Sequence, residues 1–471
     1  MSPPSPWLTE LKHLLRLAGP LAAAQAGNQL MGLVDTAIVG RLGAVELGAV
    51  GLANNLFFPL CVVGMGAMMG LDPLVSQALG AGDRAAARRL LWQGVWIALG
   101  VGLLLSVPIA VAPSLLVPFG IEPAVAAKAA TYLWIRMIGL VPLLVFVGLR
   151  AYLQAQGVVR PMIVSVVAAN LFNAWGSWLL VFGGSTLPGW AGPLRAVPAL
   201  GVAGAAIATT LCTLLQVTIV ALAVRAIEAP GFAVDDRRFD RGEVLGALRV
   251  GLPIGLQMFA EVGVFAFVGL LVGKLGAAQL AAHQIALTLA SFSFTVAVGV
   301  GSAGSVRVGR AIGAGDGPAT RRAGIVALIG GGGLMSLWAV VFLLLPAPLA
   351  GLLTDDATVI VAAVPLLAVA AVFQVSDGLQ AVGAGVLRGA GDTRFPFLAN
   401  VVGHYLVGLP VGLALGLWLG FGVQGLWWGL CTGLTVVAAT LTLRFLRLSR
   451  TTIRPLAAQP AAAAAQPLGG A

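Results

Sequence analysis

Long apolar segments recur along the whole chain, each extensive enough to cross a lipid bilayer as a helix. Such a helix needs about 20 mostly apolar residues, because lipid offers no hydrogen-bond partners to an open backbone. Only 9% of the 471 residues are charged, whereas soluble domains carry roughly 25%. The sequence therefore predicts an all-α integral membrane protein. We place twelve transmembrane helices near residues 14–40, 46–79, 88–112, 128–156, 161–183, 201–225, 244–273, 277–310, 320–352, 359–387, 396–419 and 422–446.

The basic residues are distributed unevenly between the two sides of this twelve-helix arrangement. Most of the 27 Lys and Arg residues fall at the two termini and in the even-numbered loops. The positive-inside rule then predicts that both termini are cytoplasmic. The net charge of +10 is accounted for by topology, so we expect no nucleic-acid partner. The exceptions on the opposite side are Arg41, Lys128, Arg136, Arg195 and Lys274.

The chain also contains an internal repeat. A shift of 233 positions places Pro20 on Pro253, Gly66 on Gly299, and the GAGD sequence at 80–83 on the one at 313–316. Six helices per copy is an even number, so both copies enter the membrane in the same direction. The repeat predicts two six-helix lobes related by pseudo-two-fold symmetry along the membrane normal. We assign 1–230 to the N-lobe, 231–450 to the C-lobe and 451–471 to a disordered cytoplasmic tail.

The GAGD sequence occurs a third time, at 389–392. An intramembrane aspartyl protease carries a GxGD aspartate, but it needs two such aspartates buried and facing each other. All three copies here fall at predicted cytoplasmic helix ends, where glycine adopts the left-handed conformation that ends a helix. We therefore interpret GAGD as a turn.

Four acidic residues interrupt the apolar segments: Asp35, Asp72, Glu261 and Asp377. Burying one costs at least about 2.5 kcal/mol, so such residues usually face a cavity on an ion or substrate path. We predict that Asp35, Glu261 and Asp377 handle cations. Asp72 precedes Pro73 near the cytoplasmic end of its segment. A role in breaking or capping the helix is therefore an equal alternative to cation handling for this residue.

Amides accompany these acids at helical spacing. Positions separated by three or four residues share one helix face, so each acid lies on a polar face that we expect to point inward. A carboxylate in a poorly solvated cavity binds a proton, a metal cation or an organic cation, and competition among these is the physical basis of exchange. The accompanying amides are Gln25 and Asn28 with Asp35, Gln257 with Glu261, and Gln374 with Asp377.

Apolar and aromatic residues near these segments are candidates for the lining of a cavity. Methionine is polarizable and aromatic faces attract cations, so Met65, Met69 and Phe294 fit a site for lipophilic cations; packing is the alternative for each. His283 fits either polar lining or a contact between helices. The three cysteines, at 61, 212 and 431, have no metal-ligand spacing, and we interpret them as packing residues.

Together these segments resemble the multidrug and toxic compound extrusion (MATE) family of transporters, in its NorM-like bacterial branch. The resemblance covers residues 14–446. It implies two lobes forming a V and an antiporter in the bacterial inner membrane that exports lipophilic cations against an inward gradient of sodium ions or protons. It rests on MGLVDTAIVGRLG (31–43), QALGAGDRAAARR (77–89), QMFAEVGVF (257–265), AAHQIAL (281–287) and FQVSDGLQAVGAGVLRGAGDTRFP (373–396).

The resemblance also assigns roles to residues. Asp35 matches the family's N-lobe acid, while Glu261 and Asp377 match its C-lobe pair. Asn170 and Asn173 match supporting positions, but Ser177 stands where the family has Asn or Asp. The intact C-lobe pair favours sodium over protons as the coupling ion. A sodium site needs several oxygen ligands, which Ser291, Ser293 or Thr295 could add.

We expect a monomer that contacts membrane lipid, with no cofactor beyond the coupling ion. Three alternatives stay open. A lipid flippase of the wider superfamily would need buried Arg or Lys, whereas the deep charges in this sequence are acidic. A membrane enzyme would need a recognisable nucleophile or metal motif, and the sequence has none. A passive channel could use the same acids, but their unequal placement in the two copies favours alternating access.

Overall fold

The computed structural model describes residues 5–186, 188–228 and 234–456, and these parts of the chain contain helices and no strand. In the first half, the helices are α1 (Pro6–Gly40), α2 (Ala44–Met69), α3 (Leu71–Gly80), α4 (Arg84–Leu116), α5 (Pro123–Ile138), α6 (Leu140–Gln156), α7 (Arg160–Phe182) and α8 (Gly201–Glu228). Short 3₁₀ helices η1 (Gly184–Thr186), η2 (Gly189–Ala196) and η3 (Val234–Arg237) lie before and after α8.

The second half continues with a similar succession of long helices, interrupted near its end by two π-helical stretches. These elements are α9 (Arg241–Gly273), α10 (Ala277–Gly313), α11 (Gly317–Leu344), α12 (Pro346–Gly351), α13 (Ala357–Gly389), α14 (Arg394–Val401), η4 (Val402–Gly408), α15 (Leu409–Leu413), η5 (Ala414–Trp418) and α16 (Gly422–Leu448). The predicted segment at 396–419 thus contains α14, η4, α15 and η5.

Ten helices or merged helices in the described chain are long and apolar enough to cross a membrane. Helices α5 and α6, bent by 41° at Gly139, supply an eleventh span. Helix α1 covers the first predicted segment, but Gln25, Asn28 and Asp35 interrupt its apolar sequence. The all-α membrane fold is confirmed, and the number twelve stays a prediction.

The GAGD sequences form the turns predicted from the sequence. Gly82, Gly315 and Gly391 have φ angles of 78°, 71° and 82°, in the left-handed region that favours glycine. The following aspartates begin the next helices: Asp83 Oδ1 accepts the Ala86 N–H at 2.8 Å, and Asp316 repeats this contact with Ala319. These aspartates therefore serve as helix caps. Asp392 Oδ1 accepts the Phe395 N–H at a longer 3.4 Å, and its carboxylate also forms an ion pair with Arg444 at 2.9 Å.

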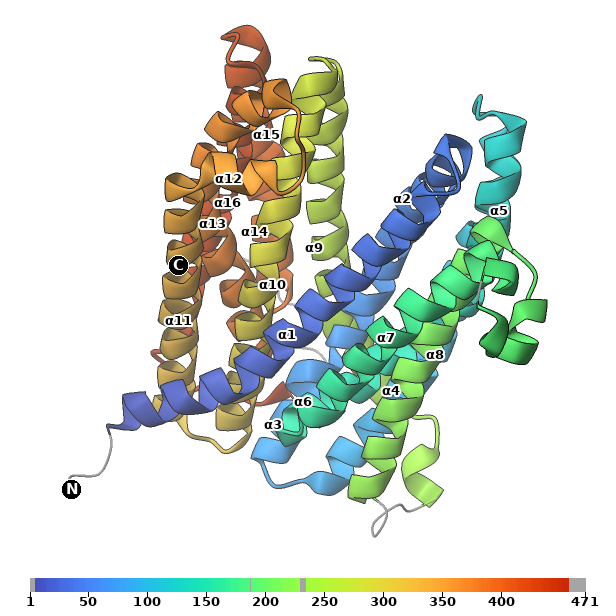
Figure 1. Ribbon diagram of the computed structural model, residues 1–471. Helices are drawn as coiled ribbons and strands as arrows, with labels where there is room; N and C mark the ends of the chain where they lie inside the picture. Colours follow the sequence, from blue (N-terminus) through green and yellow to red (C-terminus); the bar gives the residue numbers. More distant parts are fainter. Residues whose placement is uncertain (1–4, 187, 229–233, 457–471) are drawn as a thin grey trace.

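The helices form two groups, which approach each other at the end that carries the GAGD turns and diverge at the other end (Figure 1). We call α2 to α8 the first group and α10 to α16 the second group. Helices α1 and α9 pass between them. The N-terminal part of α1 packs on α10 and α11 and its C-terminal part packs on α7, whereas α9 begins against α2 and α4 and ends against α10 and α14.

The contact between the groups at the GAGD end, which we call the seam, repeats itself under the 233-residue shift. A Cβ atom added to Gly80 would lie 2.1 Å from the Arg310 carbonyl oxygen, and one added to Gly313 would lie 2.0 Å from the Gln77 carbonyl oxygen. Residue 77 corresponds to residue 310 under the same shift. Backbones therefore touch directly at the seam, in two equivalent places, which agrees with the predicted pseudo-symmetry.

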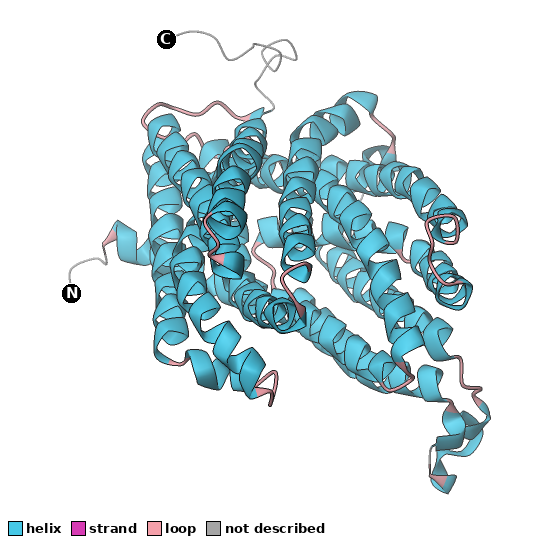
Figure 2. Cartoon of the chain, turned by 90° about the horizontal axis from the view of Figure 1, so that it is seen from above, coloured by secondary structure: helices cyan, strands magenta, loops and turns pink. Residues whose placement is uncertain are grey.

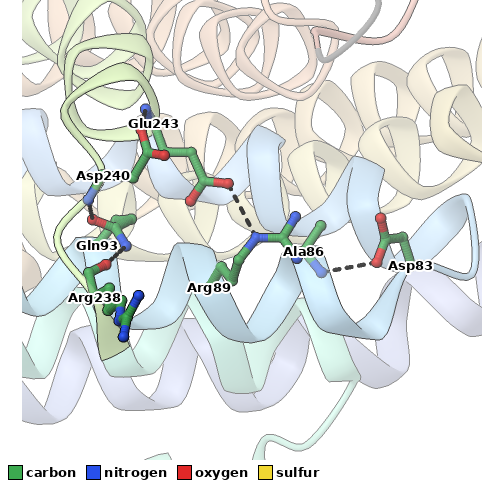
Figure 3. Close-up of polar contacts among 7 residues, drawn as sticks. All are labelled: Asp83, Ala86, Arg89, Gln93, Arg238, Asp240 and Glu243. Atoms are coloured by element: carbon green, nitrogen blue, oxygen red, sulfur yellow. Dashed lines mark hydrogen bonds and ion pairs between the residues drawn. The ribbon is translucent and has the colours of Figure 1, made fainter. Parts of the chain in front are cut away.

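The segment that joins the two halves binds to α4 just before α9 begins (Figure 3). Gln93 donates to the Arg238 carbonyl oxygen at 2.7 Å and accepts the Asp240 N–H at 3.0 Å. Arg89 pairs with Glu243 at 3.3 Å. The lobe boundary near residue 230 falls at 229–233, outside the described residues, so the division stays a prediction.

Most of the predicted tail, residues 457–471, also lies outside the described residues. Residues 451–456 run back to the seam, where the Leu456 N–H donates to Gln77 Oε1 at 2.8 Å. The Leu456 side chain lies over Gly391. The end of the described chain therefore contacts both groups.

Candidate functional site

Asp35 lies where α1 meets α7 and α8, and three side chains hold its carboxylate. Oδ1 accepts hydrogen bonds from Asn173 Nδ2 at 2.7 Å and Ser177 Oγ at 3.0 Å, and Oδ2 accepts one from Thr209 Oγ1 at 2.9 Å. Asn173 and Ser177 are completely buried. The predicted polar face of α1 thus points into the first group. Ser177, which departs from the family pattern, is a direct partner of the acid.

A basic residue accompanies this acid. Arg136 of α5 interacts electrostatically with Asp35, although no ion pair within 4 Å joins them. Its guanidinium lies 4.9 Å from the centre of the Phe57 ring, and its buried Nε has no hydrogen-bond partner in the described structure. We call Asp35, Arg136, Asn173, Ser177 and Thr209 the Asp35 site. Its acid and its base compensate each other's charge.

The other predicted polar residues of this region contact neighbours separate from Asp35. Asn28 Oδ1 accepts from Gln216 Nε2 at 3.2 Å, and Asn170 donates to the Gly27 carbonyl oxygen at 3.0 Å. Gln25 Oε1 accepts from Arg150 at 3.3 Å. The face of α1 therefore makes these three polar contacts with the first group in addition to the one at Asp35, and only the contact at Asp35 includes an acid.

Glu261 lies in the corresponding half of α9 and is held by amides. Its Oε2 accepts from Gln380 Nε2 of α13 at 3.1 Å and from Asn400 Nδ2 of α14 at 3.3 Å. Asp377, on α13, is 5% exposed and interacts electrostatically with Glu261. The side-chain oxygens of Gln380 and Asn400 are buried and have no donor within the described residues. We call these four residues the Glu261 site.

The structure thus brings the predicted C-lobe acids together and adds two partners that the sequence analysis missed. Both are amides within apolar segments, which is the same signal that identified Gln25 and Gln374. His404 was also missed. It lies four residues after Asn400 in the π-helix η4, is 1% exposed, and has no hydrogen-bond partner for either ring nitrogen among the described residues. Its ring centre lies 6.4 Å from that of Phe265 on α9.

The proposed oxygen ligands on α10 make local contacts. Ser293 donates to the Ala290 carbonyl oxygen at 2.8 Å and accepts from Gln374 at 2.6 Å. Thr295 donates to the Phe292 carbonyl oxygen at 2.7 Å. Ser291 is half-buried, and the buried Gln257 lies one turn before Glu261. Their role as sodium ligands stays a prediction.

The residues proposed to line a cavity differ in how deeply they are buried. Met69 is buried in the core of the first group and Met65 packs against that core, which favours packing for both. Phe294 is half-buried. His283 is 1% exposed and its Nδ1 accepts from Trp427 Nε1 at 3.1 Å. Of the two alternatives for His283, the contact between helices is the one observed.

Asp72 lies in the first turn of α3, two residues after the helix break at Gly70, which agrees with the helix-break alternative. Its carboxylate pairs with Arg388 across the seam at 3.5 Å, and both side chains are largely buried. Arg150 of α6 interacts electrostatically with the same carboxylate. Arg150 and Arg388 thus converge on Asp72 from different groups, an arrangement that the sequence analysis does not predict. Sequence position alone does not reveal that these segments meet.

No group of three or more His, Cys, Asp or Glu side chains that could bind a metal ion occurs in the described ranges. The three cysteines are free and buried, as the packing interpretation predicts. A hard cation such as sodium would instead use the oxygens of carboxylates and amides. Both kinds of oxygen are present in the Glu261 site.

The chain is similar to known proteins over nearly its whole length. The sequence profile of the MatE family matches residues 20–179 and 253–414, so the two matches together cover both copies of the repeat. A probable multidrug resistance protein NorM from Rhizobium meliloti (strain 1021) is 35% identical, covering 97% of this chain and 96% of that protein. A multidrug resistance protein NorM from Burkholderia vietnamiensis is 37% identical, with 91% and 92% covered.

Solved structures show the same fold. A eukaryotic MATE transporter superposes with a TM-score of 0.81 at 23% identity, covering 94% of this chain and 98% of the other. A multidrug resistance MATE transporter in an outward-facing conformation superposes with a TM-score of 0.83 at 19% identity, with 94% and 97% covered. The arrangement of the helices, with their two groups, is therefore one that MATE transporters share.

Proposed function

Because the chain belongs to the MatE family, we propose that it is a secondary antiporter that exports lipophilic organic cations in exchange for inward sodium ions or protons. The names of its NorM relatives support multidrug export. The protein is a membrane transporter and not an enzyme. The inner membrane, with both termini cytoplasmic, is the location that its bacterial relatives and the distribution of its basic residues support.

The observation that carries this proposal is the pair of acids in the Glu261 site. In the described chain, neither Glu261 nor Asp377 has an ion-pair partner. Glu261 is held by two amides that have unused acceptor oxygens. Two carboxylates in one poorly solvated place repel each other, and a bound cation or proton relieves that repulsion. The site is therefore suited to bind a coupling ion and release it.

The arrangement of the helices supports alternating access. The two groups touch at the seam and diverge at the opposite end, and the repeat relates the two halves of the seam (Figure 1). With cytoplasmic termini the seam lies on the cytoplasmic side, so the structure corresponds to a state open to the outside. Closing the outer end and separating the seam would expose the same acids to the cytoplasm.

A lipid flippase would need buried basic residues, and Arg388 is largely buried at the seam with Arg150 near the same carboxylate. A pyrophosphate site would need these guanidinium groups to be available. Arg388 is instead paired with Asp72 and Arg150 with Gln25. The antiporter therefore remains the function that the site supports best, with sodium ahead of protons because the two carboxylates and the amide oxygens are hard ligands.

Transport by the purified protein in proteoliposomes tests the proposal. We would load a fluorescent lipophilic cation and apply a sodium gradient or a pH gradient separately, for the native chain and for Glu261→Gln, Asp377→Asn and Asp35→Asn. We expect a gradient to drive transport. Glu261→Gln should remove nearly all gradient-driven transport, and Asp377→Asn should weaken it at low sodium. Transport that ignores both gradients would instead indicate a channel, and no cation movement at all would favour the flippase.

A further inference from the structure

The ion pair at the seam is asymmetric in a way that the internal repeat does not require. Asp72 belongs to α3 of the first group and pairs with Arg388 of α13 in the second group. The 233-residue shift places Ser305 at the position equivalent to Asp72. The seam therefore contains one such acid where the repeat would allow two.

Two arginines compete for this single carboxylate. Arg388 donates to Asp72 Oδ2 at 3.5 Å, near the limit of a hydrogen bond. Arg150 lies within electrostatic range of both Asp72 and Arg388. The Nε atoms of both arginines are buried without a hydrogen-bond partner in the described structure. Each guanidinium thus retains unused donors while the carboxylate is shared.

The two arginines differ in the group to which they belong. Arg150 is on α6, in the same group as Asp72, and its guanidinium meanwhile donates to the neutral Gln25 of α1. Arg388 is on the opposite group. If the groups separate at the seam, as the proposed alternating access requires, Asp72 loses Arg388 but keeps Arg150 beside it. A buried carboxylate left without a partner would be strongly destabilised.

We propose that Asp72 exchanges partners during transport, pairing with Arg388 while the seam is closed and with Arg150 while it is open. This inference rests on the proposed transport function. Arg388 therefore stabilises the closed seam and Arg150 stabilises the open one. When Arg150 turns to Asp72 it releases Gln25, so the exchange also reaches α1, the helix that carries Asn28 and Asp35.

Ser76 provides a reporter for the state of the seam. It lies one turn after Asp72, is 0% exposed, and faces Gly309 of the second group: a Cβ atom on that glycine would lie 2.8 Å from the Ser76 Cβ. A cysteine at this position should react with a water-soluble maleimide only when the seam opens. The labelling rate of Ser76→Cys would be measured in lipid nanodiscs, in full-length protein whose three native cysteines are replaced by alanine.

The two arginine substitutions should change this rate in opposite directions. Arg388→Gln removes the partner of the closed state and should speed labelling at least about tenfold, while Arg150→Gln removes the partner of the open state and should slow it by a similar factor. Arg321→Gln is the matched control, because that guanidinium bonds the Leu446 carbonyl oxygen within the second group, and it should leave the rate unchanged. General damage to packing would move both rates the same way.

If both arginine substitutions change the labelling rate in the same direction, or if Arg150→Gln leaves it unchanged, the proposal is wrong. If Arg150→Gln alone does not fold, Asp72→Asn/Arg150→Gln removes the charges as a pair, and adding Arg388→Gln to it should no longer speed labelling. A rate that still increases would also refute the exchange. Labelling needs neither substrate nor gradient, so its outcome is separate from the transport assay that tests the proposed function.

Discussion

The Asp35 site and the Glu261 site occupy corresponding halves of α1 and α9 and yet hold their acids differently. Asp35 is surrounded by three donors and has Arg136 nearby. Glu261 has two amide donors and a second acid, Asp377. With all groups ionised, the first site is neutral and the second carries two negative charges. A duplicated fold thus presents two unequal electrostatic environments, and only the second requires an added cation.

The substitution with the largest expected effect removes one of the two charges in the Glu261 site. Glu261→Gln should lower gradient-driven export roughly 100-fold, about 2.7 kcal/mol. Asp377 is then the one remaining carboxylate of the site, and without a second negative charge to repel it the site no longer favours binding of the coupling ion. The measurement is the initial rate of cation export from proteoliposomes. Glu243→Gln is the matched control on the same helix, since that acid already pairs with Arg89. Equal losses in both variants would contradict the special role of Glu261.

Asp377→Asn should have a smaller effect that depends on ion concentration. One carboxylate remains at Glu261, held by its amides, so the coupling ion should bind roughly tenfold more weakly, about 1.4 kcal/mol. Export should recover at high sodium. Titrating the initial rate against sodium concentration measures this shift. If the maximal rate falls and the ion affinity stays constant, Asp377 does not contribute to ion binding.

Arg136→Gln tests whether the Asp35 site is internally compensated. Removing this positive charge leaves Asp35 without its neighbouring cation, so lipophilic cations should bind about fivefold more tightly, roughly 1 kcal/mol. Fluorescence polarisation of a cationic dye on the purified protein provides the measurement. In the Asp35→Asn background the same substitution should have no effect. Weaker binding in Arg136→Gln alone would show that the guanidinium contributes to binding instead of competing with it.

Ser177→Ala should have the smallest effect of the series. It removes one of three hydrogen bonds to Asp35, a net contribution of about 0.6 kcal/mol because Asn173 and Thr209 remain. We expect cation affinity to change by about threefold, measured with the same dye. Ser177→Asn, which restores an amide at this position, should bring the affinity back towards the native value. If neither variant changes the cation affinity, Ser177 does not contribute to cation binding.

The sequence identified the acids of both sites because a charge within an apolar segment is conspicuous wherever the segment packs. It identified their partners less well. Thr209 and Asn400 become neighbours of an acid only through the packing of α8 and α14, and no spacing along the chain encodes those contacts. Gln380 lies three residues after Asp377 on α13, but its hydrogen bond to Glu261 of α9 also depends on helix packing. For the same reason the pairing of Asp72 with Arg388 was not predicted, since the two residues lie on different groups.

The overall architecture was predicted more fully than the irregularities within its helices. Apolar length, the repeat and the GAGD turns together determine the all-α architecture. The break at Gly70 between α2 and α3 lies two residues before Asp72, for which a helix break was one of the alternatives, but the π-helices η4 and η5 were not predicted. Hydropathy is nearly the same for α-helices and π-helices, so a pattern of apolar residues cannot distinguish them. Local packing decides, as where Gly408 and Gly412 lie against Gly429 of α16.

The hydrogen bond between the Leu456 N–H and Gln77 has a consequence for how the protein is made. The two residues are 379 positions apart, so a ribosome must complete almost the entire chain before this contact can form. Until then Gln77 lacks this backbone donor at the seam, although the backbones of α3 and α10 can already touch there. If translation stops shortly before residue 456, nearly every helix is already inserted but this contact is missing. We expect cellular quality control to recognise such chains as incomplete.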